Sequence, residues 1–234
     1  MDLAELPNPR GLVFDLDGTL VDTVETRIRA WLETFEEIGL AADREHVARL
    51  IGADGKRLAR EVAAVAGREL EDERAEAIDR RAGEIYGRLN TRPRPLSGAR
   101  ELLLALQASD LPWSIATSSR AEQVQVSIDA LDLTRQPVVV DGSQVEHAKP
   151  APDLMFRAAE RLSVPAPECW CVGDSTWDML AAEAAAMTAI GVPTGAVSAQ
   201  ALLDASATAV TDLVTLAAEL RRRRLTPDEE RVSR

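Results

Sequence analysis

The chain has 234 residues, 46% of them hydrophobic and 28% charged, and a formal net charge of −12 at pH 7. A chain of this length and composition can bury a substantial core, which excludes an intrinsically disordered protein. Its acidic surface repels nucleic-acid phosphates and anionic lipids, so we expect neither a nucleic-acid nor a membrane partner. Any anionic ligand needs a local concentration of positive charge.

The predicted elements begin with a short apolar run at 11–16, which is typical of a buried strand. The next seventy residues contain no strand pattern and are rich in Arg, Glu and Ala. Their apolar spacing predicts four helices, at 23–38, 45–51, 55–66 and 71–89. A proline-rich segment at 91–95 resists helix formation and predicts a linker back to the first domain. We therefore expect a small helical domain over residues 23–94.

Strand and helix patterns then alternate along the rest of the chain, which predicts an α/β fold. Further strands are expected at 112–117, 137–141, 169–174, 188–192 and, more weakly, 209–212, and helices at 98–108, 121–131, 152–162 and 177–186. The pattern favours a doubly wound, Rossmann-like parallel sheet with helices on both faces. Its residues would be 1–22 and 95–220, followed by a charged tail at 221–234. This tail starts with four arginines and is interpreted as a solvated helix end and a frayed terminus.

Two other features bear on location. The N-terminal residues lack a basic region followed by an apolar stretch, so no signal peptide is predicted. The longest uncharged run, 184–203, is interrupted by Gly191, Pro193 and Gly195, which argues against a membrane span. We expect a cytoplasmic protein.

Polar side chains follow four of the predicted strands. Asp15 and Asp17 come after the first, Thr117 and Ser118 after the second, Lys149 beyond the third, and Asp174 and Asp178 after the fourth. Ligands of open parallel sheets bind outside the carboxyl ends of the strands. Because those ends meet at one edge, the sequence predicts a single site there that combines carboxylates, hydroxyls and one of only two lysines.

These segments resemble the motifs of the haloacid dehalogenase-like hydrolases. The run Phe14-Asp-Leu-Asp-Gly-Thr-Leu-Val-Asp-Thr23 is similar to the first motif. Thr117, the run Lys149-Pro-Ala-Pro-Asp153, and Gly173-Asp174 with Asp178 resemble the second, third and fourth. The predicted helical insert is similar to the cap of the phosphoglycolate phosphatase and β-phosphoglucomutase branch. The resemblance covers residues 10 to 220 and implies a magnesium-dependent phosphotransferase that works through an aspartyl-phosphate.

The residue types themselves fit this chemistry. Transfer of a phosphoryl group needs a nucleophile, charge neutralisation and a proton for the leaving oxygen. Asp15 is the candidate nucleophile, and Asp17 is the candidate general acid and base. Gly18 permits a tight turn that brings both carboxyl groups near one phosphate. Gly18 and Thr19 are candidate phosphate-binding residues, although Thr19 could also be only a turn hydroxyl.

A metal and several phosphate contacts are expected at the same edge. Mg²⁺ prefers oxygen ligands, for which Asp15 and Asp174 are candidates, while Asp178 could hold the metal's waters. The resemblance adds the backbone carbonyl of Asp17. Lys149 would supply positive charge to the nucleophile and to the developing charge. Phosphate oxygens would be bound by Thr117, Ser118 and the start of the helix near residue 121.

Some of these residues also have purely structural interpretations. Ser119 with Glu122 matches a helix capping box, and Ser175 with Asp178 nearly does, so Asp178 could serve only as a cap. Lys56 lies between two predicted cap helices, where it either contacts the far end of the substrate or is a solvated helix-start lysine.

The leading functional prediction is a phosphatase of small phosphorylated metabolites, since a capped site favours small substrates over proteins. A phosphomutase of the β-phosphoglucomutase type shares every core residue and remains an alternative. A non-enzymatic, phospho-accepting regulatory domain is a further alternative, although such domains are about half this length. The sequence does not distinguish a monomer from a homodimer.

Overall fold

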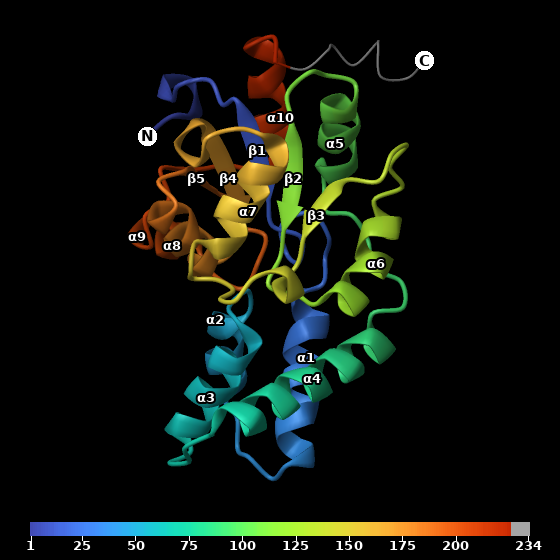
Figure 1. The fold of residues 1–234 in the computed structure, drawn as a ribbon, viewed down its shortest axis with the longest axis vertical. Helices are drawn as coiled ribbons and strands as arrows, with labels where there is room; N and C mark the ends of the chain where they lie inside the picture. Colours follow the sequence, from blue (N-terminus) through green and yellow to red (C-terminus); the bar gives the residue numbers. More distant parts are fainter. Residues whose placement is uncertain (226–234) are drawn as a thin grey trace.

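A six-stranded, entirely parallel sheet forms the centre of the upper lobe in Figure 1, which shows the computed structural model; the structure describes residues 1–225. Its strands lie in the order β3-β2-β1-β4-β5-β6. Their bounds are β1 Gly11–Phe14, β2 Trp113–Ala116, β3 Val138–Val140, β4 Cys169–Gly173, β5 Thr188–Gly191 and β6 Ala209–Val210. Each predicted strand is present, somewhat shorter than expected. The predicted α/β, doubly wound fold class is confirmed.

Helices cover both faces of the sheet. Three of them, α5 (Ala99–Gln107), α6 (Ala121–Ala130) and α10 (Leu213–Arg222), share one apolar cluster, and α7 (Asp153–Leu162), α8 (Thr176–Ala184) and α9 (Ala199–Asp204) share the other. Because side chains alternate along a strand, Leu12 and Phe14 belong to the first cluster and Val13 to the second. Short 3₁₀ turns are found at Leu3–Glu5, Gly142–Gln144 and Ala166–Glu168.

Four helices form a second lobe beyond the carboxyl ends of the strands (Figure 1). These are α1 (Val24–Glu37), α2 (Arg44–Leu50), α3 (Gly55–Val65) and α4 (Asp72–Leu89), and we call residues 24–89 the helical lobe. They bury an apolar cluster of their own, with members such as Phe35, Leu58 and Ile78. The two connections to the sheet lobe run side by side, since Val21 pairs with Pro95 and the Asp22 amide donates to the Arg94 carbonyl at 2.9 Å.

Helix α9 was not predicted, and of α10 (Leu213–Arg222) only the end, at the arginine run, was expected. Arg222 is exposed, as a solvated helix end requires, but the Arg223 side chain is only 5% exposed, which differs from the expectation. Helix α10 runs through Arg222, and the Arg223 guanidinium lies 5.1 Å from the Trp170 ring and donates to the Leu6 carbonyl at 2.8 Å. A run of arginines does not reveal that one of them binds backbone carbonyls of a segment distant in sequence. The remainder of the predicted tail, 226–234, lies outside the described residues.

The helices of residues 1–225 include no candidate membrane span. None of them combines the length and the apolar composition that crossing a bilayer requires.

Candidate active site

Asp15 and Asp174 lie on adjacent strand ends. β1 and β4 pair directly, with Phe14 opposite Val172, and the Asp15 amide donates to the Val172 carbonyl at 2.9 Å. The strand order reverses between these two strands, which is the point where open α/β sheets bind their ligands. Carboxylate oxygens of Asp15, Asp174 and Asp178 lie within 4.8 Å of one another. The predicted convergence of these three acids on one edge is thus present in the structure.

Lys149 is the cation at the centre of this cluster. Its side chain is fully buried, and its Nζ lies 2.5 Å from Asp15 Oδ1 and 2.7 Å from Asp178 Oδ1, and donates to the Ala116 carbonyl at 2.9 Å. Burial opposes the charged form, but the two carboxylates outweigh it and raise the pKa of Lys149 above its usual value. A buried ammonium group therefore stays charged beside the candidate nucleophile.

Asp178 forms the helix cap that the sequence suggested and has a second partner besides. The Ser175 amide donates to Asp178 Oδ2 at 3.0 Å and the Asp178 amide donates to Ser175 Oγ at 3.2 Å, which completes the near-match capping box at the start of α8. The other oxygen, Oδ1, forms the ion pair with Lys149. One residue thus caps a helix and balances the charge of the lysine.

The Asp174 side chain lies between two glycines, Gly18 and Gly195. A Cβ atom at Gly18, where φ is +89°, would lie 2.4 Å from Asp174 Oδ2, and one at Gly195 would lie 1.9 Å from the same oxygen. The Thr19 hydroxyl donates to Asp174 Oδ1 at 2.6 Å. The predicted residues Gly18 and Thr19 are therefore beside the acid cluster. Gly195 was missed because it belongs to no recognisable motif.

The acids at this edge carry more negative charge than one lysine can balance. Burial raises the pKa of Asp15 to about 7, although Lys149 opposes the shift, and burial together with Asp15 raises the pKa of Asp174 well above its usual value. Clustered, buried oxygen ligands with this unmet negative charge suit a divalent cation that prefers oxygen. A divalent metal therefore fits the site formed by these acids. The Asp17 side chain is not part of this cluster.

Asp17 points instead toward the helical lobe, where four side chains hold it. Its Oδ2 accepts from Arg27 Nη2 at 2.8 Å and from Ser119 Oγ at 2.8 Å, and its Oδ1 accepts from Thr23 Oγ1 at 2.7 Å and from Tyr86 Oη at 2.9 Å. Burial alone would raise the pKa of Asp17, but the Arg27 charge and these hydrogen bonds lower it overall. Asp17 is therefore held as a carboxylate in this arrangement.

None of these four partners was predicted as a site residue; Thr23 was named only as the last residue of the first motif. Ser119 was interpreted as a helix cap, which is wrong, because α6 begins after Arg120 and has no side-chain cap. Its hydroxyl donates to Asp17 Oδ2 at 2.8 Å instead, because a hydrogen bond to a charged carboxylate is stronger than one between the neutral groups of a helix cap. Arg27 and Tyr86 lie on α1 and α4, 3.4 Å apart from guanidinium carbon to ring centre. Helical periodicity predicts their helices but not their contact.

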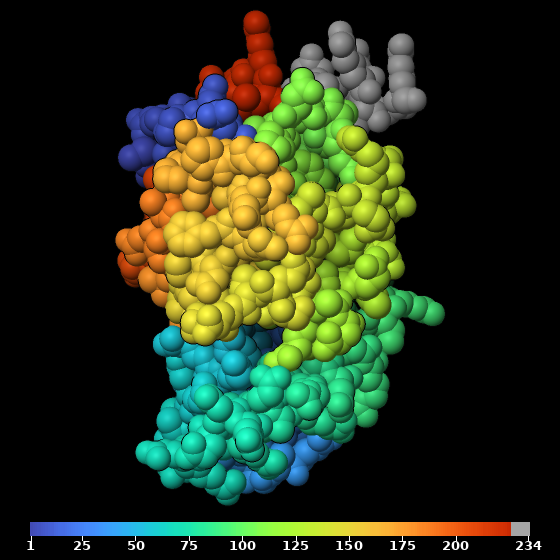
Figure 2. Space-filling model, viewed as in Figure 1, coloured from blue at the N-terminus to red at the C-terminus, as the bar shows by residue number. Residues whose placement is uncertain are grey.

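A cavity of about 60 Å³ lies between the two lobes, and Figure 2 shows a recess on the surface where they meet. Thr117 and Ser118, which were predicted to bind phosphate, line this cavity. The Thr117 hydroxyl accepts from the Ser119 amide at 3.1 Å, and Ser118 Oγ donates to the Gly52 carbonyl at 3.0 Å. Lys56 is not among the lining residues, although its neighbour Gly55 is.

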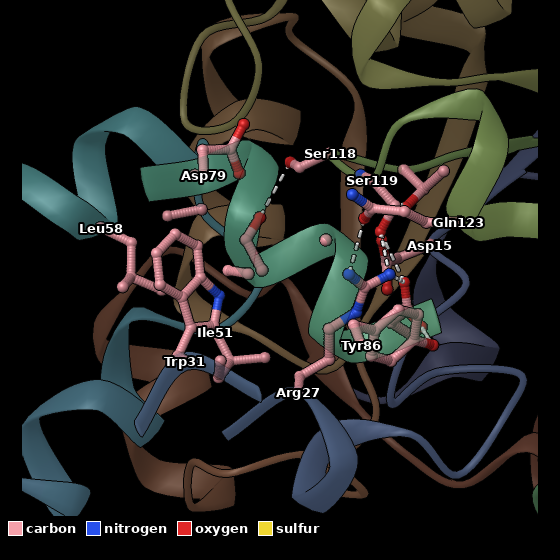
Figure 3. A pocket seen from close by; sticks show the side chains of 17 residues that line it. Asp15, Arg27, Trp31, Ile51, Leu58, Asp79, Tyr86, Ser118, Ser119 and Gln123 are labelled. Carbon is pink, nitrogen blue, oxygen red and sulfur yellow. Dashed lines mark hydrogen bonds and ion pairs between the residues drawn. The ribbon is translucent and has the colours of Figure 1, made fainter. Parts of the chain in front are cut away.

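The cavity has two different ends (Figure 3). Asp15, Arg27 and Tyr86 lie at one end. Trp31, Leu58 and Asp79 lie at the other, with Ile51 beside them. The helical lobe thus contributes an apolar wall opposite the acids.

Several contacts hold the helical lobe against the sheet lobe. The Asp54 amide donates to the Lys149 carbonyl at 2.9 Å, and Trp177 Nε1 donates to the Arg49 carbonyl at 3.0 Å. Arg120 forms ion pairs with Asp79 at 2.7 Å and with Glu76 at 2.8 Å, both on α4. The structure is therefore in a closed arrangement, with the acids covered.

Comparison with known proteins gives a consistent result. The family model described as haloacid dehalogenase-like hydrolase matches residues 12–192. A solved hydrolase from Pseudomonas syringae is 33% identical, with a TM-score of 0.85, and the match covers 91% of this chain and 98% of that one.

Two curated relatives, a phosphomutase and a phosphatase, match this chain over most of their own length. A β-phosphoglucomutase from Bacillus subtilis is 29% identical over 80% of this chain and 84% of its own, and a phosphoglycolate phosphatase from Xanthomonas campestris is 29% identical over 78% and 82%. SUPPRESSOR OF QUENCHING 1 from Arabidopsis thaliana is 30% identical over 190 residues, but this chain spans only 18% of it. By its motifs, its fold and these matches, the chain belongs to the haloacid dehalogenase-like hydrolase family, among its phosphatase and β-phosphoglucomutase members.

Proposed function

We propose that the protein is a Mg²⁺-dependent phosphatase of small phosphorylated metabolites, with Asp15 as the nucleophile. The observation that carries the proposal is the pairing of two carboxyl groups from one motif with opposite surroundings. Asp15 lies beside Lys149 and the acid cluster, while Asp17 lies at the cavity beside Arg27. Phosphoryl transfer requires one of each kind, a nucleophile near a cation and an acid near the leaving oxygen.

Two half-reactions follow from these positions. An Asp15 carboxylate oxygen attacks phosphorus; the bond from phosphorus to the leaving oxygen breaks, and that oxygen takes a proton from Asp17. In the second half, Asp17 removes a proton from water, whose oxygen attacks phosphorus and breaks the acyl phosphate bond. Inorganic phosphate leaves and both acids are regenerated. Lys149 remains paired with Asp15 and stabilises the charge that develops on the transferred group.

The reaction requires substrate binding to reverse the protonation that the surroundings of Asp15 and Asp17 favour. Asp17 is held ionised by Arg27 in this structure, yet the first half-reaction needs its proton. A phosphate dianion entering the cavity competes for the Arg27 and Ser119 hydrogen bonds, and its charge raises the pKa of Asp17. Asp15 must be ionised, and Mg²⁺ bound by Asp15, Asp174 and the Asp17 backbone carbonyl, with Asp178 holding its waters, would neutralise charge and lower the pKa of Asp15.

Replacing Arg27 tests this use of Asp17. In Arg27→Gln the cation is lost from within 2.8 Å of the carboxylate, so the pKa of Asp17 rises and its acid form persists to higher pH. We expect the alkaline limb of the pH profile of kcat/KM to move up by about one unit. Arg29→Gln, an exposed position on the same helix, is the control and should leave the limb in place. An unmoved limb in Arg27→Gln contradicts the role of Asp17.

Magnesium dependence tests the proposal as a whole. Protein treated with EDTA should not hydrolyse a generic phosphate ester, and millimolar MgCl₂ should restore hydrolysis. Since the metal-free pKa of Asp15 is about 7, protons compete with the metal below that pH. The increase in unfolding midpoint caused by MgCl₂, measured by thermal denaturation, should therefore grow as the pH rises from 5.5 to 8. Hydrolysis in EDTA at the full rate would contradict the proposal.

A phosphomutase is the second candidate. The closed cavity of about 60 Å³ favours it, because a helical lobe that limits the access of water protects the acyl phosphate from hydrolysis until a substrate hydroxyl attacks it. The same residues would act, with a substrate hydroxyl as the second nucleophile. Product analysis distinguishes the two functions, since a phosphatase releases inorganic phosphate stoichiometrically and a mutase releases an isomeric ester. The oligomeric state and the cytoplasmic location stay predictions.

A further inference from the structure

Asp79 is a carboxylate at the end of the cavity far from the acid cluster. It projects from α4, and its side chain is 17% exposed. Its Oδ2 accepts from Arg120 Nη2 at 2.7 Å and from Arg120 Nε at 3.1 Å. No described residue donates to its other oxygen, Oδ1, so this oxygen is a free acceptor in the lining of the cavity.

Gly55 makes room for this free oxygen. A Cβ atom at Gly55 would lie 1.8 Å from Asp79 Oδ1, so any larger residue at the start of α3 would displace the carboxylate. Trp31 and Leu58 form apolar surface at the same end (Figure 3). An apolar wall with one placed acceptor is typical of a site that orients a small ligand through a hydrogen bond.

The charges of the lining make the cavity unsuitable for a second anionic group. Asp15, Asp17 and Asp79 are acidic, and Arg27 is the one cation among the described residues that line the cavity. Arg27 is already paired with Asp17, and Lys56 is outside the lining. A carboxylate on the leaving group would meet Asp79 with no cation of its own, and like-charge contacts of this kind are unfavourable.

The proposed phosphatase function places the phosphate at the Asp15 end, so the leaving alcohol extends toward Asp79. On that basis we propose that Asp79 is a specificity-determining residue that accepts a hydrogen bond from a hydroxyl group of the leaving alcohol and excludes carboxylates. The substrates are then phosphate esters of short, neutral polyols or sugars. A cavity with room for a few water molecules favours a leaving group of few atoms.

Two matched pairs of esters test the inference, because the members of each pair differ only in a CH₂OH or a COO⁻ group. They are 2-hydroxyethyl phosphate with phosphoglycolate, and glycerol 3-phosphate with 3-phosphoglycerate. With MgCl₂ present, we expect kcat/KM of the full-length protein to be higher for the hydroxyl member by about tenfold or more. A preference for the carboxylate members would overturn the inference and leave the phosphatase proposal standing. If the protein hydrolyses none of the four esters, both the inference about Asp79 and the phosphatase proposal are overturned.

Two variants assign the selectivity to Asp79. Asp79→Asn keeps an acceptor oxygen but removes the charge, so the hydroxyl-to-carboxylate ratio should fall by about tenfold. Glu76→Gln breaks the other ion pair of Arg120 without changing the cavity lining, and its ratio should stay as in the unmodified protein even if kcat changes. An unchanged ratio in Asp79→Asn, or an equal fall in both variants, would overturn the inference. The ratio of the unmodified protein decides the question if Asp79→Asn does not fold.

Discussion

Replacing Asp15 by asparagine should lower kcat by about 10⁴-fold or more, because the amide cannot form the acyl phosphate. Asparagine has nearly the same size and retains an oxygen that can accept from Lys149, so the site should keep its shape. Burial disfavours the ionised form of Asp15, and the substitution removes that charge. We therefore expect the unfolding midpoint in EDTA to stay close to that of the unmodified protein, which separates a loss of catalysis from a loss of folding.

The chain offers a matched control for this variant. Asp22 belongs to the same motif but is exposed, and Asp22→Asn should retain the full rate of hydrolysis. Steady-state hydrolysis of a phosphate ester with MgCl₂ measures both variants. A rate within about tenfold of the unmodified protein in Asp15→Asn would show that another group is the nucleophile.

Replacing Lys149 by methionine should have the largest effect on stability. Its ammonium group is fully buried between Asp15 and Asp178, and without it two buried carboxylates lose their counter-charge. Removing one partner of a buried ion pair costs about 3–5 kcal/mol of unfolding free energy. The loss should be greatest at pH 8 and smaller at pH 5, where Asp15 already holds a proton because its pKa of about 7 lies above the pH.

Urea denaturation in EDTA at the two pH values measures this loss. Lys56→Met, which alters the only other lysine of the chain and one outside the acid cluster, should change the unfolding free energy by about 0.5 kcal/mol or less. Adding Asp178→Asn to Lys149→Met should recover part of the loss, because it removes one of the two unpaired charges. A destabilisation below about 1 kcal/mol at pH 8 would contradict the account of Lys149 as a buried counter-ion.

Much of the sheet lobe is predictable because its signals are local. Strands such as Cys169–Gly173 are short apolar runs, and β-strand alternation places both Cys169 and Cys171 in one apolar cluster. The acids at the strand ends are predictable for a related reason, since the geometry of a parallel sheet brings every carboxyl end to one edge. Asp15, Lys149 and Asp174 could therefore be predicted as site residues without knowledge of side-chain packing.

The residues that complete the site depend on contacts between the two lobes, which local patterns do not encode. Arg27 reaches Ser119 across 92 positions of the chain, and Tyr86 reaches Asp17 across 69. At Ser119 the local pattern predicts a helix cap, but the hydroxyl donates to the Asp17 carboxylate and α6 has no side-chain cap. Helix α9 is only six residues long, too short for helical periodicity to stand out.

Direct detection of phosphorylated Asp15 is the most decisive measurement. Protein mixed with a phosphate ester and MgCl₂, quenched in acid within one turnover and reduced with borohydride should yield a peptide in which residue 15 is homoserine, as an acyl phosphate of aspartate requires. The same treatment without the ester should leave Asp15 unmodified. Modification at another residue, or rapid turnover in which Asp15 is never modified, would contradict the mechanism.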